Sequence, residues 1–185
     1  MRAHKERLRG RTLDGIARQA GRHLPRLRDA QLARARSIEL AESFAVWMLG
    51  ADAVRRSDGK MLATLARDTQ RWHHQIKHDG RARSYARSMP RGKTSHVLCE
   101  LYVSPLAAKI DNALRWAERH LADTTQALLL NFPAYHVFAL WLTDEAGEDR
   151  MVIVDAPLTA CIKPLELLDA REFLAALRRM QAAPG

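Results

Sequence analysis

Hydrophobic positions in the first part of the chain recur every three or four residues, which is the period of an amphipathic helix. One such series crosses residues 26–54 and consists of Leu40, Phe44, Trp47, Ala51 and Val54. A second series crosses residues 62–76 and consists of Leu62, Leu65, Thr69, Trp72 and Ile76. Ser57-Asp58-Gly59 interrupts the pattern between them. Two apolar faces joined by a short break predict an antiparallel helical hairpin.

Short sequence motifs predict the structure of the segments before and after this hairpin. Residues 1–11 are basic without periodicity and predict a frayed arm. Thr12 is a candidate N-cap for an earlier helix, which Pro25 ends or bends. Residues 79–95 are rich in Gly, Ser, Pro and Arg without an apolar period, so they predict a loop. This loop separates a basic helical region, 1–93, from a sheet region, 94–185.

From residue 95 the pattern changes to the alternation of a strand, with Val97, Cys99 and Leu101 in phase. Ser104-Pro105 then predicts a helix start, an N-cap followed by proline, and the helix extends to about Leu121. The pair Asp169 and Glu172 predicts a capping box at the start of a last helix.

The most apolar part of the chain is residues 126–157. Residues 134–142 are apolar at both parities, which predicts a strand covered on both faces. Pro133 marks either a bulge or a turn before it. The acidic segment 144–149 predicts a hairpin tip leading to another strand at residues 151–154.

These elements predict an α+β fold. An N-terminal helical hairpin or bundle packs with a C-terminal β-α-β-β-β layer and a final helix. The sheet needs cover on both faces, so we expect one folded unit.

Charge is unevenly distributed along the chain. Residues 1–93 hold 22 Lys and Arg against 9 Asp and Glu, a balance of +13, and residues 94–185 hold 8 against 12, a balance of −4. The asymmetry predicts either an anionic partner for the first half or docking between the halves. The 24 Arg against 6 Lys are also typical of a GC-rich, bacterial-like genome.

Targeting signals are not evident in the sequence. The start, MRAHKERLRG, lacks an apolar core, and the longest apolar run is too short for a bilayer. We therefore expect a cytoplasmic protein that does not enter a membrane, with Cys99 and Cys161 as free thiols.

Cofactor and metal motifs are weak. Gly92-Lys93-Thr94 resembles the end of a phosphate-binding loop, but Arg87 stands where that motif needs glycine. His74 and His78 have a metal-compatible spacing but lie off the apolar face of their predicted helix, so we expect solvated histidines. The sequence predicts no cofactor and no metal.

The strongest candidate for binding is the basic segment around Tyr85, which could hold phosphate groups. Its cationic residues are Arg81, Arg83, Arg87, Arg91 and Lys93. We therefore expect a non-enzymatic binding or accessory protein that engages an acidic protein partner or a nucleic acid through its Arg-rich helical half. The alternative for this segment is a solvated Arg-rich surface or docking onto the acidic half.

A different hypothesis joins Cys99, His136 and Asp155 as nucleophile, base and orienting group. His136 opens one predicted strand and Asp155 closes the next. At these residues the C-terminal half resembles papain-like cysteine peptidases, and the resemblance implies a cysteine hydrolase. In that family the cysteine opens a helix, whereas Cys99 lies within a predicted strand.

Overall fold

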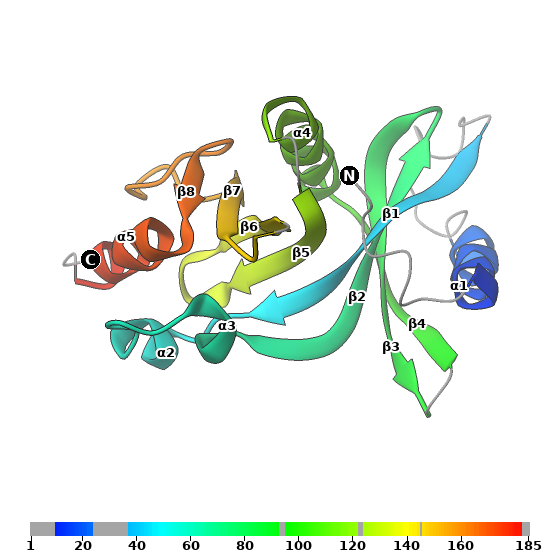
Figure 1. Ribbon diagram of the computed structural model, residues 1–185. Coiled ribbons are helices and arrows are strands. Elements are labelled where there is room, and N and C mark those ends of the chain that lie inside the picture. The colour runs from blue at the N-terminus through cyan, green and yellow to red at the C-terminus, as the bar shows by residue number, and fades with distance from the viewer. Residues whose placement is uncertain (1–9, 24–36, 93–94, 122–123, 145, 183–185) are drawn as a thin grey trace.

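Eight strands form one mixed sheet in the computed structural model, which describes residues 10–23, 37–92, 95–121, 124–144 and 146–182. The strand order is β4-β3-β2-β1-β5-β6-β7-β8 (Figure 1). The strands are β1 (Ile38–Met48), β2 (Arg67–His78), β3 (Arg81–Arg91), β4 (Ser95–Val103), β5 (Thr124–Phe132), β6 (Val137–Asp144), β7 (Asp149–Asp155) and β8 (Leu167–Asp169). The helices are α1 (Gly10–His23), α2 (Ala51–Arg55), α3 (Leu62–Leu65), α4 (Pro105–His120) and α5 (Ala170–Ala182), with a 3-10 turn, η3 (Pro133–Tyr135).

Neighbouring strands are antiparallel except at the centre of the sheet. There β1 and β5 run parallel and pair over only three positions, from Val46 with Leu129 to Met48 with Asn131. One further backbone hydrogen bond follows this pairing, from the amide of Leu49 to the carbonyl of Asn131 at 2.9 Å. The sheet is therefore two antiparallel halves joined by a short parallel seam.

The predicted N-terminal helical hairpin is wrong. Residues 38–48 and 67–78 are the paired strands β1 and β2, and residues 81–91, predicted as a loop, are β3. Residues 24–36, which include the start of the predicted long helix, lie outside the described residues. The error has a physical cause, because β1 is covered on both faces. Phe44 and Val46 pack under α4 and Trp47 packs on the opposite face, so the strand lacks an alternating pattern.

In the first half, the described residues contain one longer helix, α1, and the two short helices α2 and α3. The helix predicted from Thr12 corresponds to α1, although α1 already begins at Gly10. It packs on β4 and β1, and its Ala20 joins Ile76 of β2 and Ala86 of β3 in a small buried cluster.

In the second half, several elements that short sequence motifs predicted are present in the structure. The helix predicted after Ser104 is confirmed as α4, and the Ser104 hydroxyl accepts the Leu106 amide at 3.2 Å. Pro133 begins η3, so it marks a turn rather than a bulge. The β6–β7 hairpin is confirmed.

The capping box of the last helix is also confirmed. The amide of Glu172 donates to Asp169 at 2.7 Å, and the amide of Asp169 donates to Glu172 at 3.0 Å.

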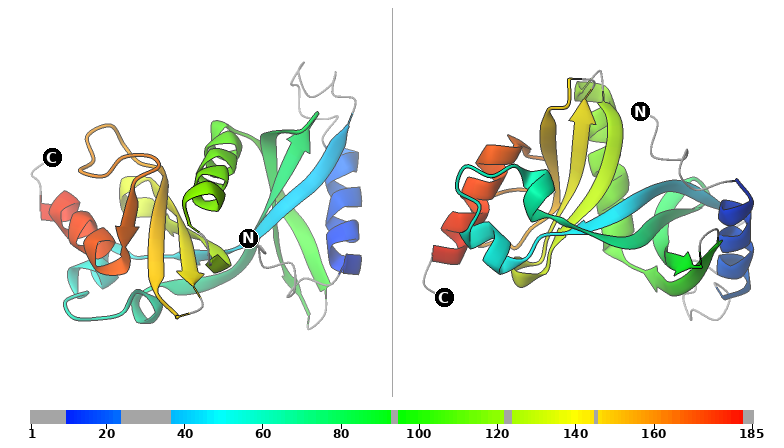
Figure 2. Two further views of the ribbon diagram at one scale, coloured as in Figure 1. Left: turned by 45° about the horizontal axis from the view of Figure 1, so that its top comes forward. Right: turned by 60° about the horizontal axis from the view of Figure 1, so that its bottom comes forward.

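Helices cover both faces of the sheet (Figure 2). One face is covered by α4, which contacts β3 in one half and β7 in the other. On the opposite face α1 lies over the β1–β4 half, while α2, α3 and α5 pack against the β5–β8 half. Pairing of β3 with β4 carries the sheet across the boundary expected near residue 93. Within the described residues, no helix combines the length and apolarity that crossing a bilayer requires.

Candidate anion-binding pocket

The candidate site lies next to a bulge in β2. The register of β2 against β1 shifts next to Val46, and Thr69 and Gln70 fall outside the ladder. The Thr69 hydroxyl donates to the Val46 carbonyl at 2.6 Å, and Asp68 accepts the Gln70 amide at 2.7 Å. Gln70 has a left-handed φ of 57°, which is uncommon for a residue with a side chain. Bulges of this kind redirect side chains and are common beside functional sites.

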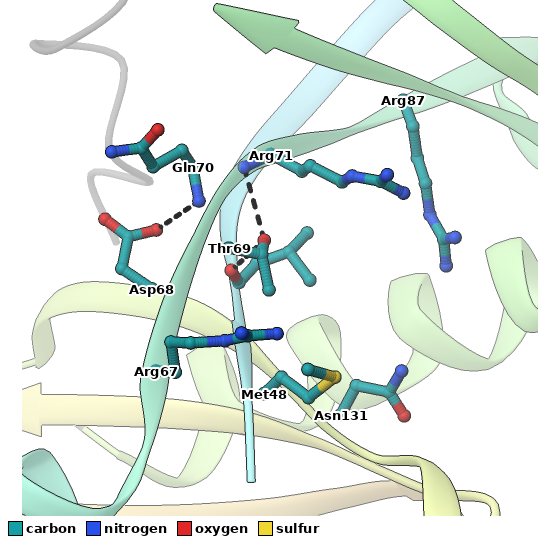
Figure 3. Close-up of a pocket in the computed structure, with 9 residues that line it drawn as sticks. Met48, Arg67, Asp68, Thr69, Gln70, Arg71, Arg87 and Asn131 are labelled. Atoms are coloured by element: carbon teal, nitrogen blue, oxygen red, sulfur yellow. Dashed lines mark hydrogen bonds between the residues drawn. The ribbon is translucent and has the colours of Figure 1, made fainter. Parts of the chain in front are cut away.

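Beside the bulge is a pocket of about 530 Å³. It is lined, apart from the bulge itself, by Val46, Met48, Arg67, Arg71, Arg87 and Asn131. Figure 3 shows the side chains of Arg67 and Arg71 extending to the same side of β2, where Arg87, Met48 and Asn131 also lie. The side chains of Asp68 and Gln70 extend to the other side.

The positive charge of the pocket is only partly compensated. Glu100 on β4 uses one oxygen for Arg71, at 3.4 Å, and the other for Arg87, at 3.1 Å. Among the described residues no carboxylate pairs with Arg67. Glu100 therefore pairs with two of the three guanidinium groups, and guanidinium groups stay charged at any physiological pH.

Two buried polar atoms at the pocket have no hydrogen-bond partner within the described part of the chain. They are the side-chain oxygen of Asn131 and Nε of Arg87. Native proteins leave few such atoms unpaired, so their presence needs a local explanation. Arg87 is only one-fifth exposed, and its guanidinium carbon lies 5.5 Å from the centre of the Tyr85 ring.

His73 on β2 is the direct cross-strand partner of Arg87 on β3 and is fully buried. Its ring stacks on Tyr85 with centroids 4.4 Å apart, and neither ring nitrogen has a hydrogen-bond partner among the described residues. Burial, followed by the charges of Arg87 and His74, lowers the pKa of His73 well below its usual value. The imidazole is therefore neutral and adds no charge beside the pocket.

The other predicted surface histidines are also buried, which corrects the expectation of solvated side chains. His74 lies between the hydroxyl groups of Ser43, at 2.9 Å, and Ser88, at 2.8 Å. His78 lies 2.8 Å from the hydroxyl of Ser84. These residues lie on β2 rather than on a helix, so i,i+4 spacing does not place them on an exposed helical face. Within the described residues no group of three or more metal-ligating side chains occurs.

The predicted basic segment is not a compact cluster. Arg81, Arg83, Arg87 and Arg91 are spread along β3, whose ends are about 34 Å apart at the rise of a β-strand. Only Arg87 of these lines the pocket. Lys93 lies outside the described residues.

The structure does not bring Cys99, His136 and Asp155 together. Cys99 is on edge strand β4 and His136 directly precedes β6, with β3, β2, β1 and β5 between them. Five strand spacings correspond to about 24 Å. Burial, followed by the charge of Glu100, raises the pKa of the Cys99 thiol, which disfavours the thiolate. Asp155 pairs instead with Lys109 at 2.6 Å.

Sequence reasoning missed Arg67, Arg71 and Asn131. The two arginines are four residues apart, which on the predicted helix would have placed them on one solvated face. The Thr69 between them favours a strand and was the available signal. Asn131 carries no such signal, because it reaches the pocket through the parallel pairing of β5 with β1.

Comparison with protein-family models, with curated proteins and with solved structures gave no match for this chain.

Proposed function

We propose that this protein is a binding module that holds a phosphate-bearing anion in the pocket formed by Arg67, Arg71 and Arg87. The observation that carries the proposal is that three arginines line one concave volume and that only two of them, Arg71 and Arg87, are paired with a carboxylate, that of Glu100. The proposal requires binding alone and invokes no chemical step.

Arginine suits phosphate because its planar fork can donate two parallel hydrogen bonds to one anionic group. Arg71 is the most suitable donor in this pocket. Its side chain is 44% exposed, and its contact with Glu100, at 3.4 Å, is longer than that of Arg87. A bound phosphate can therefore engage Arg71 without dismantling the shorter Arg87–Glu100 pair.

The rest of the pocket supports the same conclusion. Asn131 adds to the lining a side-chain amide, of which the amino group can donate to an anion (Figure 3). The excess of positive charge in residues 1–93 attracts anions over a longer range and raises their rate of encounter.

The proposal is tested by titrating inorganic tripolyphosphate into the purified chain by calorimetry. Arg71→Gln should weaken binding by about tenfold or more, because a hydrogen bond to a charged group contributes about 1.5–3 kcal/mol. Affinity should also fall as NaCl is raised from about 50 to about 200 mM.

Arg179→Gln is the matched control, because it removes the same charge from an exposed position on α5. It should bind tripolyphosphate as the unmodified chain does. Equal affinity of all three proteins would mean that the anion is attracted by net charge alone, and the proposed pocket would be rejected.

A further inference from the structure

A row of three rings crosses the sheet beside the pocket. His73 on β2 stacks on Tyr85 of β3 at 4.4 Å, and Tyr85 lies 5.2 Å from Tyr102 of β4. The first two rings are buried, whereas Tyr102 is 43% exposed. The row therefore begins in the core and ends at the surface on the edge strand.

This row and the pocket occupy the same face of the sheet. Tyr85 and Tyr102 are direct partners across β3 and β4, as are Arg87 and Glu100 two residues further along. The guanidinium of Arg87 lies over the Tyr85 ring and so connects the row to the pocket. Tyr102 is level with Gln75 of β2 across two strand spacings, and Arg71 lies four residues from Gln75, so the backbones of Tyr102 and Arg71 are about 16 Å apart.

We propose that the anion held in this pocket is a phosphate of single-stranded nucleic acid, with an unpaired base stacked on Tyr102. This inference rests on the proposed function and adds the class of ligand. A guanidinium-lined pocket next to an exposed aromatic ring matches the two interactions used for single strands, namely charge along the backbone and stacking on the bases.

The alternatives use only part of this surface. In a duplex the bases are stacked inside and cannot lie flat on Tyr102, so a duplex gains only the phosphate contacts. An acidic protein segment supplies carboxylates to the arginines but no flat ring to place on the tyrosine. Of these three ligand classes, an unpaired strand is the one that uses both features.

The chain has a suitable net charge for this ligand. Its formal charge is +9 and its pI is about 10.2. Binding to phosphates should therefore be rapid and salt-dependent, while stacking on Tyr102 should depend little on salt.

The experiment compares two ligands on the full chain. Fluorescence anisotropy follows a labelled oligo(dT) of about 12 nucleotides, within the usual size of one single-strand site. Calorimetry follows inorganic tripolyphosphate, which has charge but no base. Tyr102→Leu should weaken oligo(dT) binding by about tenfold and leave tripolyphosphate binding unchanged, because it removes only the stacking surface. Tyr102→Phe keeps a ring and should bind both ligands as the unmodified chain does.

Two controls separate this inference from the proposed function. Tyr135→Leu removes a half-buried tyrosine on η3 and should affect neither ligand. Arg71→Gln should weaken both ligands. If Arg71→Gln weakens both while Tyr102→Leu weakens neither, the anion pocket stands and the nucleic-acid inference is overturned.

Two further results would overturn the inference. One is equal affinity for oligo(dT) and for the same strand paired with oligo(dA). The other is equally tight binding of poly-glutamate, which would indicate an acidic protein as the partner. If Arg71→Gln has no effect on either ligand, the proposed function itself fails.

Discussion

His74 lies inside the sheet with a serine hydroxyl at each ring nitrogen. Its two partners, Ser43 on β1 and Ser88 on β3, connect three neighbouring strands through side chains as well as through the backbone ladder. Burial, and then the charge of His96, lowers the pKa of His74 from 6.5 to about 4. This histidine is therefore a structural group that must remain neutral in the folded protein.

Acid should destabilise the fold through this residue. Above pH 6.5 the imidazole is neutral in both the folded and unfolded chain. Between pH 6.5 and about pH 4 only the unfolded chain takes up the proton, so stability falls across that window. The full shift corresponds to about 3 kcal/mol. Between about pH 7.5 and about pH 5 the free energy of unfolding should fall in both proteins. The fall should be about 1–2 kcal/mol smaller in His74→Gln than in the unmodified chain.

Urea unfolding at the two pH values measures this difference. His23→Gln, which replaces an exposed histidine on α1, is the control and should keep the pH dependence of the unmodified chain. If the free energy of unfolding of His74→Gln changes with pH as it does in the unmodified chain, His74 is not the cause of the acid destabilisation.

At the scale of single residues, only part of the pocket could be predicted. Arg87 was identified because it lies in an Arg-rich segment with Tyr85. Arg67 and Arg71 converge with it only after β2 and β3 pair, and Asn131 only after β1 and β5 pair. A cluster assembled by pairing between distant segments leaves no local spacing in the sequence.

Among the elements, the helices with strong end signals were predicted, and so was β6, whose residues are apolar at both parities, whereas β1 and β2 were not. Ser104-Pro105 and the Asp169–Glu172 pair fix the starts of α4 and α5 through hydrogen bonds that any tertiary context can use. β1 and β2 lack the alternation of a half-exposed strand. In β2 the pattern is further hidden by polar residues, such as His74, that are buried by pairing with serines.

The cap of α4 gives a prediction at this scale. Ser104→Ala should lower the free energy of unfolding by about 1 kcal/mol, because the Leu106 amide loses its acceptor. Ser104→Asp should retain most of the stability, since aspartate is an equally good cap. Urea unfolding with an unchanged m-value checks both variants. Equal stabilities of the alanine and aspartate variants would show that the cap contributes nothing.

For the whole molecule, α4 is the helix that connects the two halves of the sheet. It contacts β3 and β7, which lie on opposite sides of the β1–β5 seam. Ile110, at its centre, is completely buried in the core that includes Phe44 and Val152. This packing predicts that the two halves unfold together.

Ile110→Ala tests that prediction. It should lower the free energy of unfolding by about 2–5 kcal/mol, because it leaves a cavity under α4. Amide hydrogen exchange should show the same loss of protection in β2 and in β6. Met180→Ala, at the partly buried edge of α5, should cause a smaller loss. Loss of protection confined to one half would show that the halves unfold separately.

The short parallel seam between β1 and β5 has a mechanical consequence. Among the described residues, three residue pairs and the amide of Leu49 hold the two halves edge to edge. If the chain were stretched from its ends, this joint would carry load with few backbone bonds. Because α4 contacts both halves of the sheet, it would hold them together under this load. The two halves should therefore separate once α4 detaches from one of them.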